Sequence, residues 1–75
     1  GGAAPNPVAM VQQLASRLEG NPNDLEGWLR LIRAYSVLGD RPKATAALTK
    51  AKGVFANQAQ AQAALAKEAQ ELTLD

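Results

Sequence analysis

The sequence predicts an all-α fold in which about four antiparallel helices stack as helix-turn-helix pairs. Alanine is abundant while β-branched and aromatic residues are few, and this composition favours helix along the chain. Asn, Asp, Gly and Pro recur where helices would begin and end. Between them, apolar residues repeat at i, i+3, i+4 and i+7, the spacing of one helix face. Connections of about two to four residues then make neighbouring helices antiparallel.

The first helix is expected from Pro7 to Glu19. Asn6 suits the N-cap, and Pro7 suits the first helical position, where its missing N–H costs nothing. Gly20 is expected to take the left-handed conformation that ends a helix, and Pro22 prevents continuation. The apolar face consists of Val11, Leu14, Ala15 and Leu18.

The second helix is expected from Asp24 to Leu38. Asn23, followed three residues later by Glu26, forms a capping-box pattern, and Gly39 closes the helix. This helix has the strongest apolar stripe of the chain, made of Trp28, Leu31, Ile32, Tyr35 and Leu38.

The third helix is expected from Arg41 to Val54, with Asp40 as its cap and Pro42 tolerated in the first turn. Its buried face consists of Ala44, Ala47, Leu48, Ala51 and Phe55. The fourth helix is expected from Gln58 to Leu72, and Asn57 with Gln60 repeats the capping pattern. Its thinner apolar face consists of Ala61, Leu65, Ala69 and Leu72. The residues expected to be buried are Leu14, Leu18, Trp28, Leu31, Tyr35, Leu48, Ala51 and Leu65.

Length and composition restrict the classes of function. The chain has 75 residues, no Cys, no His and a net charge of +1. One small domain over 7–75 is expected, after a segment 1–6 that is either disordered or left over from cloning. The balanced charge gives no footprint for nucleic acid, and no apolar run reaches the ~18–20 residues of a membrane span. The basic group Arg41, Lys43, Lys50 and Lys52 is therefore interpreted as a solvated helix face.

The chain also carries an internal repeat. When the sequence is shifted by 34 residues, several structural positions coincide: Leu14 with Leu48, Leu31 with Leu65, Leu38 with Leu72, Asn23 with Asn57 and Glu26 with Gln60. Thirty-four residues is the period of the tetratricopeptide family, and two runs resemble its motif: Trp28-x2-Leu31-Ile32-x2-Tyr35 and Ala44-x3-Leu48-x2-Ala51. Ile32 and Ala56 depart from that motif, which usually has a small residue and a proline there. The resemblance implies one full repeat over about 25–58, with half-repeats at 7–20 and 58–73.

A second resemblance is more specific. The run 14–39, and above all its core LEGWLRLIRAY at 25–35, resembles the tetratricopeptide region of the bacterial cytochrome c biogenesis proteins called CcmI or CycH. The resemblance implies a membrane anchor outside this segment and a location on the periplasmic side of the inner membrane. It also implies two kinds of protein partner: apocytochrome c, bound through its C-terminal helix, and subunits of the haem-ligation complex.

No catalytic or metal-binding group is expected. Ser16 and Ser36 have no His or Cys partner, so a Ser–His or Cys–His nucleophile is excluded, and no carboxylate cluster indicates a metal or another cofactor. The chain is therefore predicted to be a non-enzymatic interaction module. Two alternatives stay open, namely a structural segment that self-associates through exposed apolar ends and a repeat scaffold of an unrelated complex.

The candidate peptide-binding residues lie on the second helix. In tetratricopeptide arrays the first helix of each repeat lines the concave groove. The residues of this helix that the core does not use are Glu26, Leu29, Arg30, Arg33, Ser36 and Val37. A helical peptide in a groove needs apolar contact and charged selection, which Leu29 and Arg33 offer together. The alternative is an ordinary solvated helix face.

Overall fold

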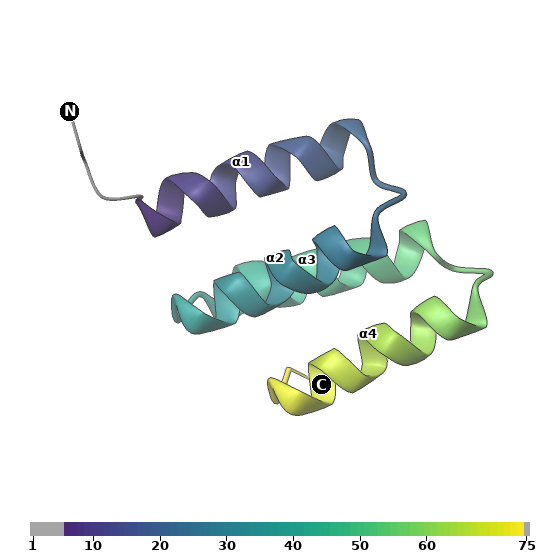
Figure 1. Cartoon of the computed structure of the whole chain (residues 1–75). Coiled ribbons are helices and arrows are strands. Elements are labelled where there is room, and N and C mark those ends of the chain that lie inside the picture. The colour runs from purple at the N-terminus through teal and green to yellow at the C-terminus, as the bar shows by residue number, and fades with distance from the viewer. Residues whose placement is uncertain (1–5, 75) are drawn as a thin grey trace.

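Residues 6–74 of the chain are described by a computed structural model, which contains four helices. These are α1 (Pro7–Gly20), α2 (Leu25–Val37), α3 (Arg41–Val54) and α4 (Ala59–Glu71). Consecutive helices run antiparallel, with α1 and α4 on opposite sides of the α2–α3 pair (Figure 1). The predicted all-α stack is confirmed. The expected N-terminal segment 1–6 lies outside the described residues except for Asn6, whose side chain accepts a hydrogen bond from the Val8 N–H and caps α1.

The 34-residue period appears in the helix boundaries. Helix α3 begins at Arg41, 34 residues after Pro7, and ends at Val54, 34 residues after Gly20. Helix α4 begins and ends 34 residues after the start and end of α2. The second half of the described chain thus repeats the helical layout of the first half, as in a tetratricopeptide stack.

Helix α2 is the centre of the packing. It contacts α1, α3 and α4, and α3 also contacts α4, whereas no Cα atom of α1 lies within 8 Å of a Cα atom of α3. The largest fully buried side chains are Leu18, Ile32 and Leu65, which come from α1, α2 and α4. Small residues let α3 approach α2 closely, since Ala44 and Ala51 are both completely buried. The remaining core residues are Val11, Trp28, Leu31, Ala47, Leu48, Phe55, Ala61 and Ala69.

Five side chains of the predicted apolar stripes are less buried than expected. Leu14, Ala15, Tyr35 and Leu72 are half-buried, and Leu38 is 42% exposed. For Ala15, Tyr35 and Leu38, which line the gap between α1 and α3, the cause is the separation of these two helices. Helix α1 has only α2 to pack against, so the sides of α1 and α2 that face the gap keep contact with solvent.

The capping boxes predicted for α2 and α4 are wrong. The N-cap of α2 is Asp24, whose Oδ1 accepts a hydrogen bond from the Gly27 N–H at 3.0 Å, while Asn23 is exposed. A carboxylate is favoured over an amide there because it also interacts with the positive end of the helix dipole. The N-cap of α4 is Gln58, 34 residues later, and its side chain makes no cap hydrogen bond.

Helices α2 and α4 end in the same Schellman motif. After α2, the Gly39 N–H donates to the Ser36 carbonyl and the Asp40 N–H donates to the Tyr35 carbonyl, with Gly39 at φ +81°. After α4, Thr73 occupies the position of Gly39 at φ +55°. The same two bonds recur there, from Thr73 to Gln70 and from Leu74 to Ala69.

The predicted left-handed termination at Gly20 is wrong. Gly20 is the last helical residue of α1, and Asn21 follows as C-cap at φ −142°. The chain leaves this helix in an extended direction towards Pro22, so no left-handed residue is needed. The Pro22 carbonyl then accepts a hydrogen bond from the Trp28 indole N–H at 2.9 Å, which fastens the connection to α2.

Candidate peptide-binding surface

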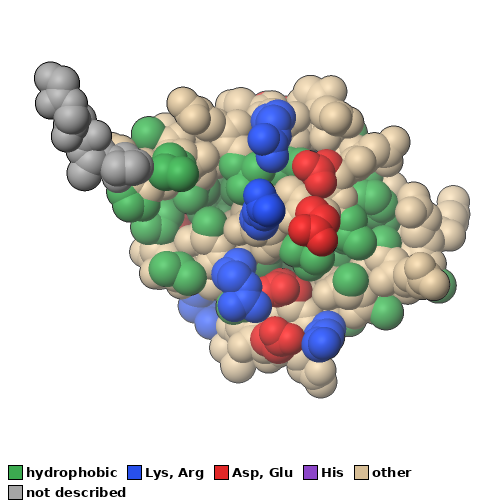
Figure 2. Space-filling view, in the orientation of Figure 1, with side chains coloured by type: hydrophobic (Ala, Val, Ile, Leu, Met, Phe, Trp, Pro, Cys, Tyr) green, Lys and Arg blue, Asp and Glu red, His purple; other side chains and the backbone are tan. Residues whose placement is uncertain are grey.

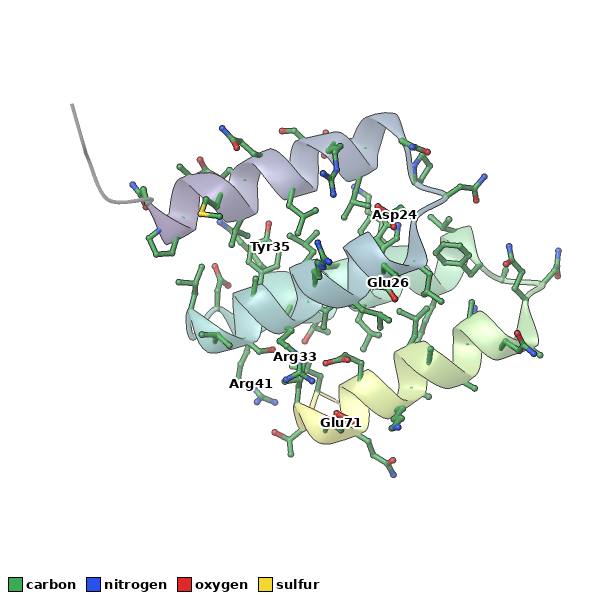
Figure 3. All side chains as sticks on the ribbon, in the orientation of Figure 1. Asp24, Glu26, Arg33, Tyr35, Arg41 and Glu71 are labelled. Atoms are coloured by element: carbon green, nitrogen blue, oxygen red, sulfur yellow. The ribbon has the colours of Figure 1, made fainter. Side chains whose placement is uncertain are left out.

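The face of α2 that holds the predicted binding residues looks away from the gap between α1 and α3. At about 100° per residue, Glu26, Leu29, Arg30 and Arg33 centre on a direction roughly opposite to that of Trp28 and Tyr35. Glu26 and Arg30 are exposed. Figure 3 shows Glu26 at the start of α2 and Arg33 towards its other end, on the side that borders α4.

Arg33 does not have a free guanidinium. Its Nη2 contacts the Glu68 carboxylate and lies 3.4 Å from Glu71 Oε2, so Arg33 bridges α2 to α4 (Figure 3). The Glu68 side chain is 14% exposed and Arg33 is 53% exposed. Such a partly solvated network stabilises a fold by at most about 1 kcal/mol. Arg33 therefore has a structural contact that the sequence analysis did not anticipate, because its partners lie 35 and 38 residues away along the chain.

The other predicted residues differ in their availability. Leu29 is half-buried and packs against the core, so it offers only part of its side chain to a ligand. Ser36 is also half-buried, and its Oγ is buried without a hydrogen-bond partner among residues 6–74. Val37 is 79% exposed at the last turn of α2. On the first and middle turns of α2, the structure thus brings together the partly accessible Leu29 with Arg30 and Glu26, which make no ion pair within residues 6–74.

Charges of both signs lie side by side on this face of the molecule. Figure 2 shows a column of basic side chains next to a column of acidic ones, running across the helices in the orientation of Figure 1. Three ion pairs account for part of the pattern: Arg17 lies 3.9 Å from Asp24, and Arg33 contacts both glutamates of α4. The face is suited to a ligand that carries charges of both signs, because neither sign dominates it.

A groove that the sequence pattern does not predict lies on the other side of α2. It has a volume of about 590 Å³ and lies where α1 and α3 diverge, with Trp28, Leu31 and Tyr35 of α2 as its floor. Its walls come from Ala15 and Glu19 of α1 and from a row on α3 that includes Lys43, Ala46, Ala47 and Lys50. The signal in the sequence was the i, i+3, i+4, i+7 spacing of that row. The sequence places Ala47 on the buried face and Lys43 and Lys50 on a solvated one, because the gap beside α3 depends on helix packing that no local pattern predicts.

Two kinds of site were searched for among the described residues, a metal site and a membrane-spanning helix. No group of three or more acidic side chains that could hold a metal ion occurs within residues 6–74. None of the helices α1–α4 has the length and apolar character required to cross a membrane. The features that remain are the charged face of α2 with α4 and the apolar groove between α1 and α3.

Part of the chain is similar to two longer proteins of known type. The cytochrome c-type biogenesis protein CycH of Bradyrhizobium diazoefficiens is 55% identical over 47 residues, which cover 63% of this chain and 13% of that protein. The protein of the same name from Rhizobium meliloti is 56% identical over 39 residues, which cover 52% of this chain and 10% of that protein. The likeness therefore spans only a small part of either relative. No family model matches the chain, and no solved structure matches it.

Proposed function

We propose that this chain is a non-catalytic protein-interaction module of c-type cytochrome biogenesis, which binds apocytochrome c and presents it for haem attachment. One observation carries the proposal: over 47 residues, more than half of the positions are identical to those of a protein named for cytochrome c biogenesis. The exposed face of α2 supports it, because a bound helical peptide needs apolar contact and charged selection and this face offers both. The partners would be apocytochrome c and subunits of the haem-ligation complex, on the periplasmic side of the inner membrane.

The proposed binding surface is the exposed face of α2. A helical peptide, such as the C-terminal helix of an apocytochrome c, would lie along the row of Glu26, Leu29, Arg30 and Arg33. Arg30 is the best-placed cation, because it is exposed and makes no ion pair within residues 6–74, and its guanidinium can hold a ligand carboxylate through two hydrogen bonds. The accessible part of Leu29 adds apolar contact. Arg33 would contribute only by giving up contacts to α4, while Ser36 and Val37 extend the row at its far end.

A titration tests this proposal. Isotope-labelled protein receives increasing amounts of a peptide with the sequence of an apocytochrome c C-terminal helix, and the backbone amide shifts are followed. We expect shifts concentrated on α2 around Leu29 and Arg30. A Leu29→Ala/Arg30→Ala variant should bind about 5- to 30-fold more weakly if these residues are hot spots.

The matched control is Lys52→Ala, which removes one exposed cation from α3. It should leave the affinity within about twofold, since exposed charges away from a contact contribute little. Full affinity in the double variant, or shifts confined to α3, would exclude the α2 face. Arg33→Ala is a poor choice for this test because it also removes the bridge to α4.

A structural segment that self-associates is the second candidate function. Among residues 6–74, four large apolar side chains are exposed: Val8 by 52%, Met10 by 58%, Val37 by 79% and Leu38 by 42%. They belong to the first turns of α1 and the end of α2, which lie at the same end of the stack (Figure 1). Sedimentation equilibrium over a wide concentration range separates the two functions. A tight dimer that Val37→Ser dissociates favours self-association, and a monomer at all concentrations excludes it.

A further inference from the structure

The groove between α1 and α3 continues along most of α2. A second hollow, of about 200 Å³, is lined by Val8 and Val11 of α1 and by Leu38, and it shares Tyr35 and Lys43 with the first. The floor therefore follows one face of α2 from Trp28 to Leu38, at positions i, i+3, i+7 and i+10. Ten residues of helix correspond to a length of about 15 Å, or nearly three turns.

The groove has an apolar floor and one basic wall. Trp28 and Leu31 are almost fully buried, and the indole N–H already donates to the Pro22 carbonyl, so the deepest part of the floor presents carbon atoms. On α3, two lysines, Lys43 and Lys50, flank the small residues Ala46 and Ala47. Seven residues separate the two lysines, which places them on the same side of α3 about 10 Å apart.

The two lysines differ in the ion pairs that they make within the protein. Lys43 Nζ lies 3.8 Å from Asp40 Oδ2, in an exposed pair that is worth little. Lys50 is exposed and makes no ion pair within residues 6–74. Two carboxylates also line the groove: Glu19 on α1, opposite the lysines, and Asp40 beside Lys43. The groove thus attracts negative charge along its α3 side, most strongly at Lys50, and can hold a positive charge near Glu19 or Asp40.

We propose that this groove is a second docking surface, which takes an acidic amphipathic helix of about three turns from a partner protein. Large apolar side chains of that helix would lie over Trp28, Leu31 and Tyr35. Its carboxylates, spaced seven residues apart along one edge, would pair with Lys43 and Lys50. The alanines at 46 and 47 let a helix backbone approach α3 closely. This surface lies on the opposite side of α2 from the face proposed for apocytochrome c, so the inference does not depend on that proposal.

Charge favours a partner over a second copy of this chain. Two aspartates cap helices and two glutamates contact Arg33: these are Asp24, Asp40, Glu68 and Glu71. The other acidic residues within residues 6–74 are Glu19 and Glu26, which lie on different helices. No described helix of this chain therefore presents two free carboxylates seven residues apart.

A designed peptide tests the inference. The probe is a capped 14-residue helix of alanine, leucine and glutamate, with leucines on one face and glutamates along one adjacent edge. Trp28 is the only tryptophan, so its fluorescence reports occupation of the floor. We expect a saturable change of this signal, about fivefold or greater weakening by Lys50→Glu, and an effect of less than twofold by Lys52→Glu. A peptide with lysines in place of the glutamates should bind at least fivefold more weakly.

The two lysine variants form a matched pair. They change the net charge equally, both positions are exposed on α3, and only Lys50 lines the groove. If both variants weaken peptide binding equally, the protein's overall charge accounts for the effect and the inference is overturned. Equal binding of the lysine peptide, or no saturable response to the glutamate peptide, would overturn it as well. A dimer formed without peptide that Lys50→Glu dissociates and Val37→Ser does not would assign the groove to a second copy instead.

Discussion

Replacing Trp28 by Ala should come close to unfolding the protein. Trp28 is 3% exposed and belongs to the hydrophobic core, and its indole N–H donates a hydrogen bond to the Pro22 carbonyl. An aromatic side chain of this size buries roughly 200 Å² of surface, which at about 25 cal/mol per Å² corresponds to about 5 kcal/mol. Large-to-small substitutions of aromatic core residues cost about 3–5 kcal/mol. The whole stability of a domain this small is only about 4–11 kcal/mol.

The measurement is urea unfolding followed by far-ultraviolet circular dichroism, because the substitution removes the only tryptophan. With a slope of about 1 kcal/mol per molar urea, the midpoint should fall by about 3 M or more. Trp28→Phe is the control that keeps an aromatic ring. This variant loses some side-chain volume and the indole hydrogen bond, which is worth about 0.5–1.5 kcal/mol. Because Pro22 is exposed, water can donate to its carbonyl in place of the indole. A Trp28→Ala variant that melts cooperatively within about 1 kcal/mol of the wild type would refute the central place of the indole in the core.

Three substitutions near helix ends should change stability in directions that the same urea experiment measures. Thr73→Gly should stabilise by about 0.5–1 kcal/mol, because a β-branched residue at φ +55° is strained and glycine is not; no gain would show that this strain is absent. Gln58→Asp should gain about 0.5–1 kcal/mol by giving α4 the side-chain cap that it lacks, and an unchanged midpoint would mean that the new carboxylate does not cap. Gly27→Ala should cost about 1–2 kcal/mol even though alanine is the better helix former. A Cβ there would lie 2.6 Å from Asp24 Oδ2 and 2.8 Å from Leu18 Cδ2, and stabilisation by this variant would mean that both side chains move freely.

Most of the fold could be predicted because each helix carries its own local signals. Asn6 and Asp40 are short polar residues directly before proline-containing first turns, and both cap as expected. Gly39 ends α2 in the left-handed conformation that glycine adopts without strain. The errors at helix starts arose between neighbouring polar residues. Asn23 and Asp24 are both good caps by residue type, and only the path of the chain after Pro22 selects Asp24.

The contacts between distant helices could not be predicted from local patterns. On a helical wheel, Arg33 lies on the face of α2 expected to be solvent-exposed. In the structure its guanidinium forms ion pairs with Glu68 and Glu71 of α4. The partial exposure of Tyr35 likewise depends on how far α1 stays from α3. Helix propensity and apolar spacing determine which side chains face inwards, whereas the separation of helices that are not neighbours in sequence depends on the packing of all four.

The repeat itself explains why α2 carries most of the features that bear on binding. The position of Trp28 is taken in α4 by Gln62, which also ties its helix to the preceding connection, donating to the carbonyls of Lys52 and Phe55. The position of Tyr35 is taken by Ala69. Helix α4 thus keeps the repeat's layout without its large aromatic side chains, so α2 forms a broad apolar floor and a charged row that α4 does not.

These two surfaces of α2 are separated by the helix itself. The residues of the groove floor and those of the charged row point in directions about 180° apart, so peptides on the two surfaces would not touch each other. Binding at one surface can then change affinity at the other only by moving or stiffening α2. Because α2 is held by three other helices, we expect the two peptides to bind nearly independently, with affinities that change by less than about threefold when the other site is occupied. Mutual exclusion in a competition titration would mean that both peptides use one surface, and the Lys50→Glu and Leu29→Ala/Arg30→Ala variants would identify which.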